Sequence, residues 1–173
     1  MGQREKLDDL PVFPTPPAPD SFRNWRLQVG GLADDPKVFG YEELLSMQSA
    51  EVVADFACEE GWEVPGLRWT GVPLVDLINA VEPGDEARYV AIGSGDFVAS
   101  LAWPDIEAGE PLVAYMLNGD VIPWEHGGPL RLVLQGGVCY QSVKWVDRIE
   151  LTADSSAETA SGVALARIGK ASP

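Results

Sequence analysis

Glycine and proline recur along this chain and divide it into short apolar segments. The 173 residues include 18 glycines and 14 prolines, which favour tight turns over long helices. The strongest single turn signal is Asn118-Gly119, a pair typical of two-residue β-hairpins, between the apolar runs 112–117 and 121–122. We therefore expect short strands joined by turns, in a single domain, because this length suits one hydrophobic core.

The apolar segments have mostly the character of strands. Strands are predicted where valine, isoleucine and aromatic residues cluster, over residues 25–29, 51–57, 88–92, 97–101, 112–117, 121–122, 130–134 and 143–151. Short helices are predicted over residues 41–47 and 73–81. In the second, Pro73 stands in the first turn, where its missing N–H costs nothing. One face of that helix carries Leu74, Leu77, Ile78 and Val81. The expected class is α+β, with mixed, curled β-sheets and short helices.

The two ends of the chain differ from its body in composition. Residues 1–20 are proline-rich and favour an extended arm, and residues 153–173 read as a weakly ordered tail. The body is then residues 21–152. No apolar run approaches the roughly 20 residues that span a bilayer, and residues 1–19 contain no apolar core of a signal peptide. These features predict a cytoplasmic protein without a membrane segment.

The chain is strongly acidic, with 27 Asp and Glu against 12 Lys and Arg and a net charge of −15. No cluster of basic residues offers a face for phosphate backbones, so we expect no nucleic-acid partner. The simplest role of the charge is solubility. An anionic ligand would be repelled by the average field, so its site must be locally basic. This makes Arg131, Lys144 and Arg148 informative.

Cys58 follows the predicted strand 51–57 and is one of two cysteines, with Cys139. Thiolates are ligands for soft metals. Glu59 and Glu60 come next and would disfavour a free thiolate nearby, whereas a bound metal would deprotonate the thiol outright. The local sequence leaves two roles open for Cys58, a metal ligand and an inert structural cysteine.

His126, the only histidine, lies in a segment, Glu-His-Gly-Gly-Pro, that must turn. A lone histidine is more often structural than catalytic. Arg131 stands within the apolar run that follows, and Lys144 stands within another. A charged residue in such a run either faces solvent or needs an anionic partner. Together Arg131 and Lys144 form a candidate anion pocket, because arginine offers a planar fork and lysine a point charge.

At this point several motifs, in this order, resemble one known family. The first is Cys58-x-x-Gly61-Trp62 with Trp69-x-Gly71-Val72-Pro73-Leu74. The others are Leu117-Asn118-Gly119, Ile122-Pro123, His126-Gly127-x-Pro129-Leu130-Arg131 and Ser142-Val143-Lys144-Trp145-Val146. Over about residues 24–152 the chain resembles the molybdopterin-binding domain of the sulfite oxidase family. Within that family it is most similar to the branch with the catalytic subunit of bacterial methionine-sulfoxide reductase.

The resemblance implies a fold, a cofactor and a set of site residues. It implies the single-domain fold of that family and a molybdenum–molybdopterin cofactor, with Cys58 as the protein ligand to the metal. By residue-to-residue correspondence it implies that the organic part of the cofactor is held by His126, Arg131, Ser142, Val143, Lys144, Gly93 and Ser94. The asparagine contacts of the reductase branch are not recognisable, although Asn24 is placed to serve.

The departures from the family pattern concern the substrate. Sulfite oxidases carry arginines just after the ligand cysteine, where this chain has Glu59 and Glu60. Their tyrosine in a Tyr-Gly-Ala-Ser-Ile-Pro segment corresponds here to Phe97. Carboxylates near the metal would repel anionic sulfite. Cys139 and Gln141 also replace what are often a glycine and a basic residue in the cofactor segment.

Three functions are compatible with these residues. The first is a molybdenum oxidoreductase that transfers oxygen atoms to or from a small non-sulfite substrate, with S-oxide or N-oxide reduction favoured and an unidentified electron-transfer partner. The second is a degenerate cofactor-binding or interaction module without catalytic activity. The third is a cysteine hydrolase using Cys58 and His126, for which no basic neighbour activates the nucleophile.

Overall fold

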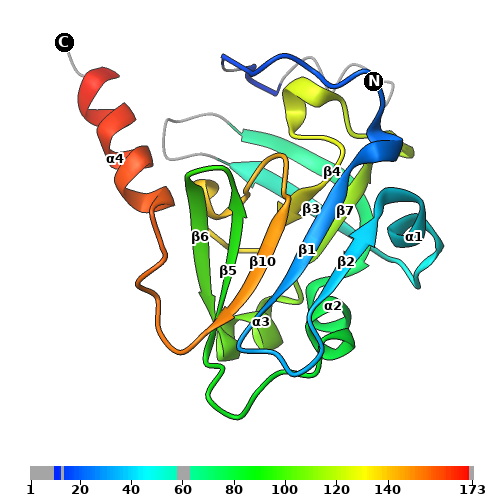
Figure 1. The fold of residues 1–173 in the computed structure, drawn as a ribbon. Coiled ribbons are helices and arrows are strands. Elements are labelled where there is room, and N and C mark those ends of the chain that lie inside the picture. Colours follow the sequence, from blue (N-terminus) through cyan, green and yellow to red (C-terminus); the bar gives the residue numbers. More distant parts are fainter. Residues whose placement is uncertain (1–9, 13, 58–62, 172–173) are drawn as a thin grey trace.

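The computed structural model describes residues 10–12, 14–57 and 63–171, and its strands form two sheets (Figure 1). The first sheet is five-stranded, in the order β2 (Lys37–Gly40), β1 (Arg26–Gly31), β10 (Arg148–Thr152), β5 (Tyr89–Ser94) and β6 (Phe97–Ala102). Strands β1 and β10 pair in parallel, and the other neighbours are antiparallel. The sheet is therefore mixed, as expected for this fold class.

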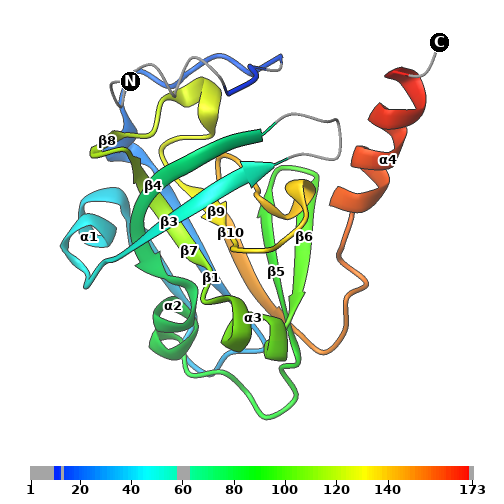
Figure 2. The same cartoon turned by 180° about the vertical axis from the view of Figure 1, so that it is seen from behind.

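The second sheet is antiparallel and strongly bent around the first (Figure 2). Its order is β3 (Ala50–Ala57), β4 (Glu63–Pro73), β7 (Leu112–Leu117) and β8 (Asp120–Val121), and β9 (Arg131–Val133) also pairs with β7. Asn118 and Gly119 join β7 to β8 with φ of 52° and 85°. Two successive left-handed residues are what a tight hairpin turn of this kind requires.

The helices are short and lie around the sheets. They are η1 (Phe22–Asn24), α1 (Tyr41–Ser46), α2 (Leu74–Ala80), α3 (Trp103–Gly109), η2 (Trp124–His126), η3 (Cys139–Gln141) and α4 (Ala160–Ala171). In α2, the side chains of Leu74, Leu77 and Ile78 are fully buried, as the predicted apolar face requires. Among the described residues, no helix has the length and apolarity to cross a membrane.

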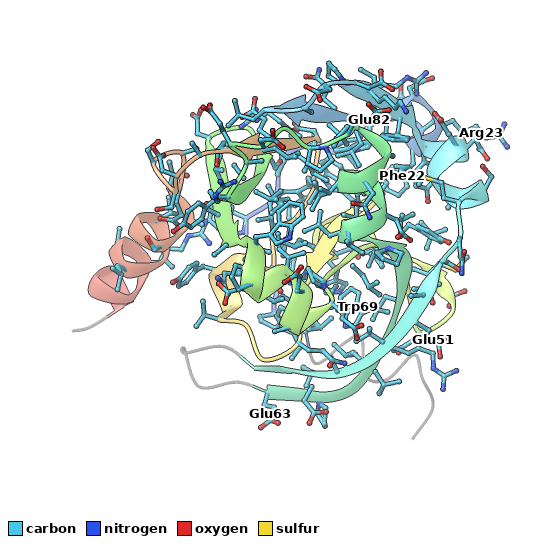
Figure 3. The ribbon with its side chains drawn as sticks, turned by 90° about the horizontal axis from the view of Figure 1, so that it is seen from below. Phe22, Arg23, Glu51, Glu63, Trp69 and Glu82 are labelled. Carbon is cyan, nitrogen blue, oxygen red and sulfur yellow. The ribbon has the colours of Figure 1, made fainter. Side chains whose placement is uncertain are left out.

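Two clusters of buried side chains form the core. The larger cluster fills the space between the sheets and includes Leu27, Leu77, Ile92, Leu101 and Leu132. The smaller cluster lies under β3 and β4 and comprises Leu10, Phe56, Val64, Leu67, Trp69, Ala114, Leu117, Ile122 and Val133, with Cys139 packed against it. Figure 3 shows Trp69 on the inner side of β4, while Glu51 and Glu63 project outward.

The predicted strand over residues 143–151 is wrong in its first half. Only Arg148–Thr152 forms a strand, and residues 143–147 cross between the two sheets. Trp145 adopts a left-handed φ of 54°, which no strand tolerates. Residues 143–147 form hydrogen bonds with three separate parts of the fold instead of with one neighbouring strand. The apolar composition of this segment therefore does not indicate a strand.

Strand β4 was not expected from the sequence, because Pro65, Gly66 and Gly71 interrupt its pattern. The structure accommodates them with irregularities. The register shifts between Ala54 and Phe56 of β3, and the Asp55 carboxylate accepts a 2.7 Å hydrogen bond from the Gly66 N–H. The register against β7 shifts again between Thr70 and Gly71. Such bulges keep a long strand paired while it bends.

Three other elements lay outside the expectations. Strand β2 and helix α3 are short, and helix α4 occupies most of the segment for which a weakly ordered tail was expected. The sequence at its start, Ala-Ser-Gly-Val-Ala-Leu-Ala-Arg, is rich in alanine, the best helix former, which explains why a helix forms there. The division into arm, body at 21–152 and tail stays a prediction.

Candidate cofactor site

The segment 143–147 is bonded to three other segments that carry predicted site residues. Its backbone accepts a hydrogen bond from Leu132 N–H at Val143 and donates one from Trp145 N–H to the carbonyl of Gly127, at 2.9 and 3.0 Å. It also donates from Asp147 N–H to the Gly93 carbonyl, at 3.1 Å. One irregular segment thus connects the histidine turn, strand β9 and the end of β5.

Arg131 is the most deeply buried charged residue among those described, with 5% of its surface exposed. Strand β9 points it into the smaller core cluster, where its guanidinium carbon lies 4.6 Å from the Phe56 ring centroid and 5.4 Å from that of Trp69. Its Nη1 donates a 2.8 Å hydrogen bond to the His126 carbonyl. Cation–π contacts and one hydrogen bond hold the cation in place.

No carboxylate neutralises Arg131 among the described residues. Their four ion pairs use Arg23, Lys37, Arg68 and Arg148 instead. Within the same residues, the buried donors Arg131 Nε and Trp69 Nε1 have no hydrogen-bond acceptor. Burial lowers the pKa of Arg131 to about 10, so it is still protonated at neutral pH. A buried cation with an unused donor is suited to an anionic ligand, such as the phosphate of a pterin cofactor.

Lys144 adds a second positive charge near Arg131. Its Nζ donates to the Glu125 carbonyl at 3.0 Å and lies 5.7 Å from the centroid of the Trp145 ring. Burial, and after it repulsion from Arg131, lowers the pKa of Lys144 to about 8. The two cations therefore share one electrostatic environment, as the predicted anion pocket requires.

His126 is buried, with 6% of its surface exposed, and ends the short helix η2. The next residue, Gly127, has a left-handed φ of 97°, and a Cβ there would lie 2.7 Å from Lys144 Cγ. Only glycine permits this approach of the two segments. The Gly127 position thus explains how a histidine turn and a lysine far away in sequence become neighbours.

Ser142 and Val143 precede Lys144 directly. Ser142 follows η3 and donates its N–H to the Cys139 carbonyl at 3.1 Å, with its side chain partly exposed. Val143 is fully buried in the larger cluster. Its side chain is thus a packing group, and only its backbone could face a ligand.

Gly93 and Ser94 lie at the end of β5, beside the segment 143–147. A Cβ at Gly93 would approach Arg148 Nη2 at 2.9 Å, and the same Nη2 donates to the Gly95 carbonyl at 2.9 Å. The two-residue turn that follows Ser94 is therefore tied to β10. The structure places the backbone of Gly93 and Ser94 on the same side of the fold as Asp147.

Asn24 is exposed on η1, and aromatic contacts bring this helix to η2. The ring of Trp124 lies 6.3 Å from that of Phe22 and 6.0 Å from that of Trp25. Trp25 Nε1 donates to the Val146 carbonyl, and Trp145 Nε1 to the Trp124 carbonyl, at 2.9 and 2.8 Å. The cluster of Phe22, Trp25, Trp124 and Trp145 supports the site from outside. Trp124 was not among the site residues expected from the sequence.

Asp147 is a further residue that the sequence did not single out. Its Oδ1 is buried without a hydrogen-bond partner, and burial raises the pKa of its carboxyl. Its backbone is bonded to Gly93, so it stands at the junction of the site segments. Its signal in the sequence was only its place after the Ser-Val-Lys-Trp-Val motif.

Cys58 lies outside the described residues, as do Glu59 and Glu60. The flanking strands are described up to Ala57 and from Glu63, and these two residues pair. Phe56, two positions before Cys58, contacts Arg131. The described end of β3 therefore lies beside Arg131.

A separate surface pocket of about 680 Å³ lies at the opposite end of β5 and β6. It is lined by Pro83, Gly84, Ala87, Arg88, Tyr89, Ala102, Trp103, Pro104 and Ala153. None of the predicted site residues contributes to it.

Comparisons with known proteins identify the family of this domain. The family model of the oxidoreductase molybdopterin binding domain matches residues 13–160. An uncharacterized oxidoreductase, YuiH of Bacillus subtilis (strain 168), is 31% identical over 149 residues, which cover 84% of this chain and 75% of that protein. A nitrate reductase (NADPH) of Fusarium oxysporum is 27% identical over 164 residues, which cover 79% of this chain and 18% of that protein.

Among solved structures, the sulfane dehydrogenase SoxCD from Paracoccus pantotrophus superposes with a TM-score of 0.72 at 25% identity. The match covers 80% of this chain and 41% of that chain. This chain thus spans less than half the length of the nitrate reductase and of the SoxCD chain. The expected α+β fold and the expected cofactor class are both confirmed. The chain belongs to the family of oxidoreductase molybdopterin-binding domains, and it is a molybdopterin-dependent oxidoreductase whose cofactor is molybdenum–molybdopterin.

Proposed function

We propose that Cys58 is the protein ligand to molybdenum and that the segments around Arg131 and Lys144 hold the organic part of the cofactor. The observation that carries this proposal is the burial of Arg131 with an unused Nε donor and no carboxylate among the described residues. The remaining contacts of the proposed site are His126, Ser142, Val143, Gly93, Ser94 and Asn24.

The residues of the chain have separate roles in this proposal. Arg131 and Lys144 neutralise the phosphate of the cofactor, and the Arg131–His126 hydrogen bond orients the histidine turn. The backbone of Gly93 and Ser94 offers polar groups at close range, because glycine leaves room beside β10. The aromatic cluster of Phe22, Trp25, Trp124 and Trp145 packs around η2 and the segment 143–147 and stabilises their positions. The bound cofactor supplies two-electron redox chemistry with oxygen-atom transfer.

We propose a small neutral or cationic S-oxide or N-oxide as the substrate. Reduction of an S-oxide takes two electrons and two protons and releases the sulfide and water. Glu59, Glu60 and Phe97 stand where sulfite oxidases have arginines and a tyrosine, and the net charge of −15 disfavours free anions. A separate redox protein would deliver the electrons. Nitrate and sulfane sulfur are suitable comparison substrates, because the relatives include a nitrate reductase and a sulfane dehydrogenase.

The test combines metal analysis with a panel of substrates. Protein purified from a host that makes the cofactor should contain close to one molybdenum per chain, and Cys58→Ser should lose the thiolate signature in its absorption and paramagnetic resonance spectra. Cys139→Ser, at the other cysteine, is the matched control and should keep both. With a reduced dye as electron donor, S-oxide or N-oxide reduction should exceed nitrate reduction. With an oxidised dye as electron acceptor, sulfite oxidation should be slower than either. A Cys58→Ser variant with unchanged spectra would refute the ligand assignment.

A further inference from the structure

We propose that the indole N–H of Trp69 donates a hydrogen bond to the phosphate of the cofactor and binds this anion together with Arg131. This inference rests on the proposed function and adds a residue to the proposed site. Trp69 lies on β4, and its side chain points inward from that strand (Figure 3). None of its surface is exposed. A group that accepts its hydrogen bond must therefore be buried as well.

Trp69 begins a motif, Trp69-x-Gly71-Val72-Pro73-Leu74, in which packing explains the other buried positions. The side chains of Val72 and Leu74 are buried in the larger core cluster. A Cβ at Gly71 would overlap the backbone of β7, so glycine allows the two strands to approach. The rings of Trp69 pack in the smaller cluster in the same way. Packing gives no role to the indole N–H.

Two buried donors lack an acceptor at this place. Among the unpaired buried side-chain atoms of the described residues, only Trp69 Nε1 and Arg131 Nε are groups that can donate but not accept. Their side chains lie together, since the Arg131 guanidinium carbon is 5.4 Å from the centroid of the Trp69 ring. A buried indole N–H usually has a hydrogen-bond partner. An acceptor is therefore missing for two neighbouring side chains at once.

The positions of both donors are fixed by the surrounding structure. The backbone of Trp69 pairs with β3 on one side and with β7 on the other. The Trp69 and Phe56 ring centroids are 6.3 Å apart, with the Arg131 guanidinium carbon over both rings. The hydrogen bond from Arg131 Nη1 to the His126 carbonyl restrains the other end of the guanidinium. Neither donor can turn to solvent unless the smaller cluster is disrupted.

An anion satisfies these donors better than a water molecule. Water could accept both hydrogen bonds, but it would leave the buried charge of Arg131 without a counter-charge, which is costly. The chain has 27 Asp and Glu residues, and none of those described forms an ion pair with Arg131. A phosphate has several oxygens, which can accept from an indole and a guanidinium at once. We assign the anion to the cofactor, because the proposed function places its phosphate at Arg131.

The experiment follows the indole N–H signals of the six tryptophans by nitrogen–proton NMR in the full-length, cofactor-free protein. Trp69→Phe identifies the signal of Trp69 by its loss. Inorganic phosphate, added at pH 7 and low salt, should shift this signal. The signal of Trp103, which lines the separate surface pocket, should not move. Trp69→Phe should weaken phosphate binding by about 10-fold, as for one hydrogen bond to a charged group, and Trp103→Phe should leave it unchanged.

A second variant separates loss of the donor from loss of packing. A tryptophan analogue with sulfur in place of the indole N–H, incorporated at residue 69, keeps both rings and cannot donate. It should bind phosphate as weakly as Trp69→Phe does. An affinity equal to that of the wild type would show that Trp69 serves only in packing, and this result would overturn the inference.

The cofactor-loaded protein distinguishes the cofactor phosphate from an anionic substrate. Free phosphate should not shift the Trp69 signal in the loaded protein, because the cofactor already occupies the donor. A shift that persists there would assign the donor to a substrate and overturn the inference. Phosphate binding that Arg131→Met abolishes, but that never moves the Trp69 signal of the wild type, would overturn the inference and leave the proposed function intact. A wild-type protein that binds no phosphate would contradict both.

Discussion

The guanidinium carbon of Arg131 lies 4.6 Å from the centroid of the Phe56 ring, so a buried cation rests on the described end of β3. Phe56 is two residues before the proposed metal ligand, and Arg131 follows the histidine turn. This contact joins the two sequence regions that resemble the family's metal segment and cofactor segment.

Replacing Arg131 with methionine should separate binding from stability. Met keeps the contacts with Phe56 and Trp69 but removes a buried charge, so the apo protein should keep its stability or gain about 1–4 kcal/mol against urea. Cofactor retention should fall, by about 1–3 kcal/mol of binding free energy, because a charge-assisted hydrogen bond is lost. Arg68→Met, at an exposed arginine on β4 paired with Glu51, is the control and should change neither quantity appreciably. A loss of both in Arg131→Met would mean that the arginine is structural.

Anion binding by the apo protein should weaken as the pH rises from 7 to 9. Lys144 has a pKa lowered to about 8, so deprotonation removes its positive charge within this range, while Arg131, with a pKa of about 10, stays charged. Sulfate is the suitable probe because it does not titrate here. Its affinity should fall by up to about tenfold across these two pH units, following the protonated fraction of the lysine. Lys144→Arg should abolish most of this dependence, and a wild-type curve without a slope would contradict it.

The same shift has a consequence for stability with the opposite sign. The pKa of Lys144 is lower in the folded protein than the ordinary value of 10.5, so between about pH 8 and 10.5 the unfolded chain binds the proton more readily. The contribution of Lys144 to the free energy of unfolding should therefore rise with pH through this window. Urea denaturation of the wild type and of Lys144→Met, compared at pH 7.5 and 9.5, would measure it. Lys144→Met should have the higher free energy of unfolding at pH 7.5, and its advantage over the wild type should shrink at pH 9.5.

Gly71→Ala and Gly162→Ala should change stability in opposite directions. A Cβ at Gly71 would overlap the Val113 carbonyl oxygen and Ala114 Cα on β7, where the register shifts. The substitution should cost about 1–3 kcal/mol or more, since backbone must move. Gly162 lies in α4 with nothing within 4 Å of an added Cβ, so alanine should stabilise the helix by about 0.5–1 kcal/mol. Denaturation midpoints of the two variants would show both effects.

Thr159→Val should loosen α4 without unfolding the domain. It removes the acceptor of Val98 N–H and the donor to the Asp96 carbonyl, so protection of the α4 amides from hydrogen exchange should drop. The cost is about 1 kcal/mol for the exposed threonine. Thr159→Ser keeps the hydroxyl and should retain most of the protection. Equal exchange in the two variants would show that the hydroxyl does not hold the helix.

Much of the fold could be predicted from local patterns. The hairpin at Asn118-Gly119, the helix before Met47 and the helix after Pro73 all follow from residues adjacent in sequence. The exceptions depend on contacts between distant residues. Strand β4 needs Asp55 to bind the Gly66 N–H across the sheet, and no periodicity within β4 reveals this.

Some features of the predicted site follow from the sequence, and others depend on the fold. Residue type and order alone reveal the family motifs and the scarcity of basic residues. They therefore also single out Arg131 and Lys144. Which cations lie close together depends on the three-dimensional fold. Arg131 is buried on Phe56 and Trp69 because β3, β4 and β9 enclose it, and its charge lowers the pKa of Lys144 from a different segment of the chain. Electrostatic interactions depend on distance and burial in space, and a linear pattern contains neither for residues far apart in the chain.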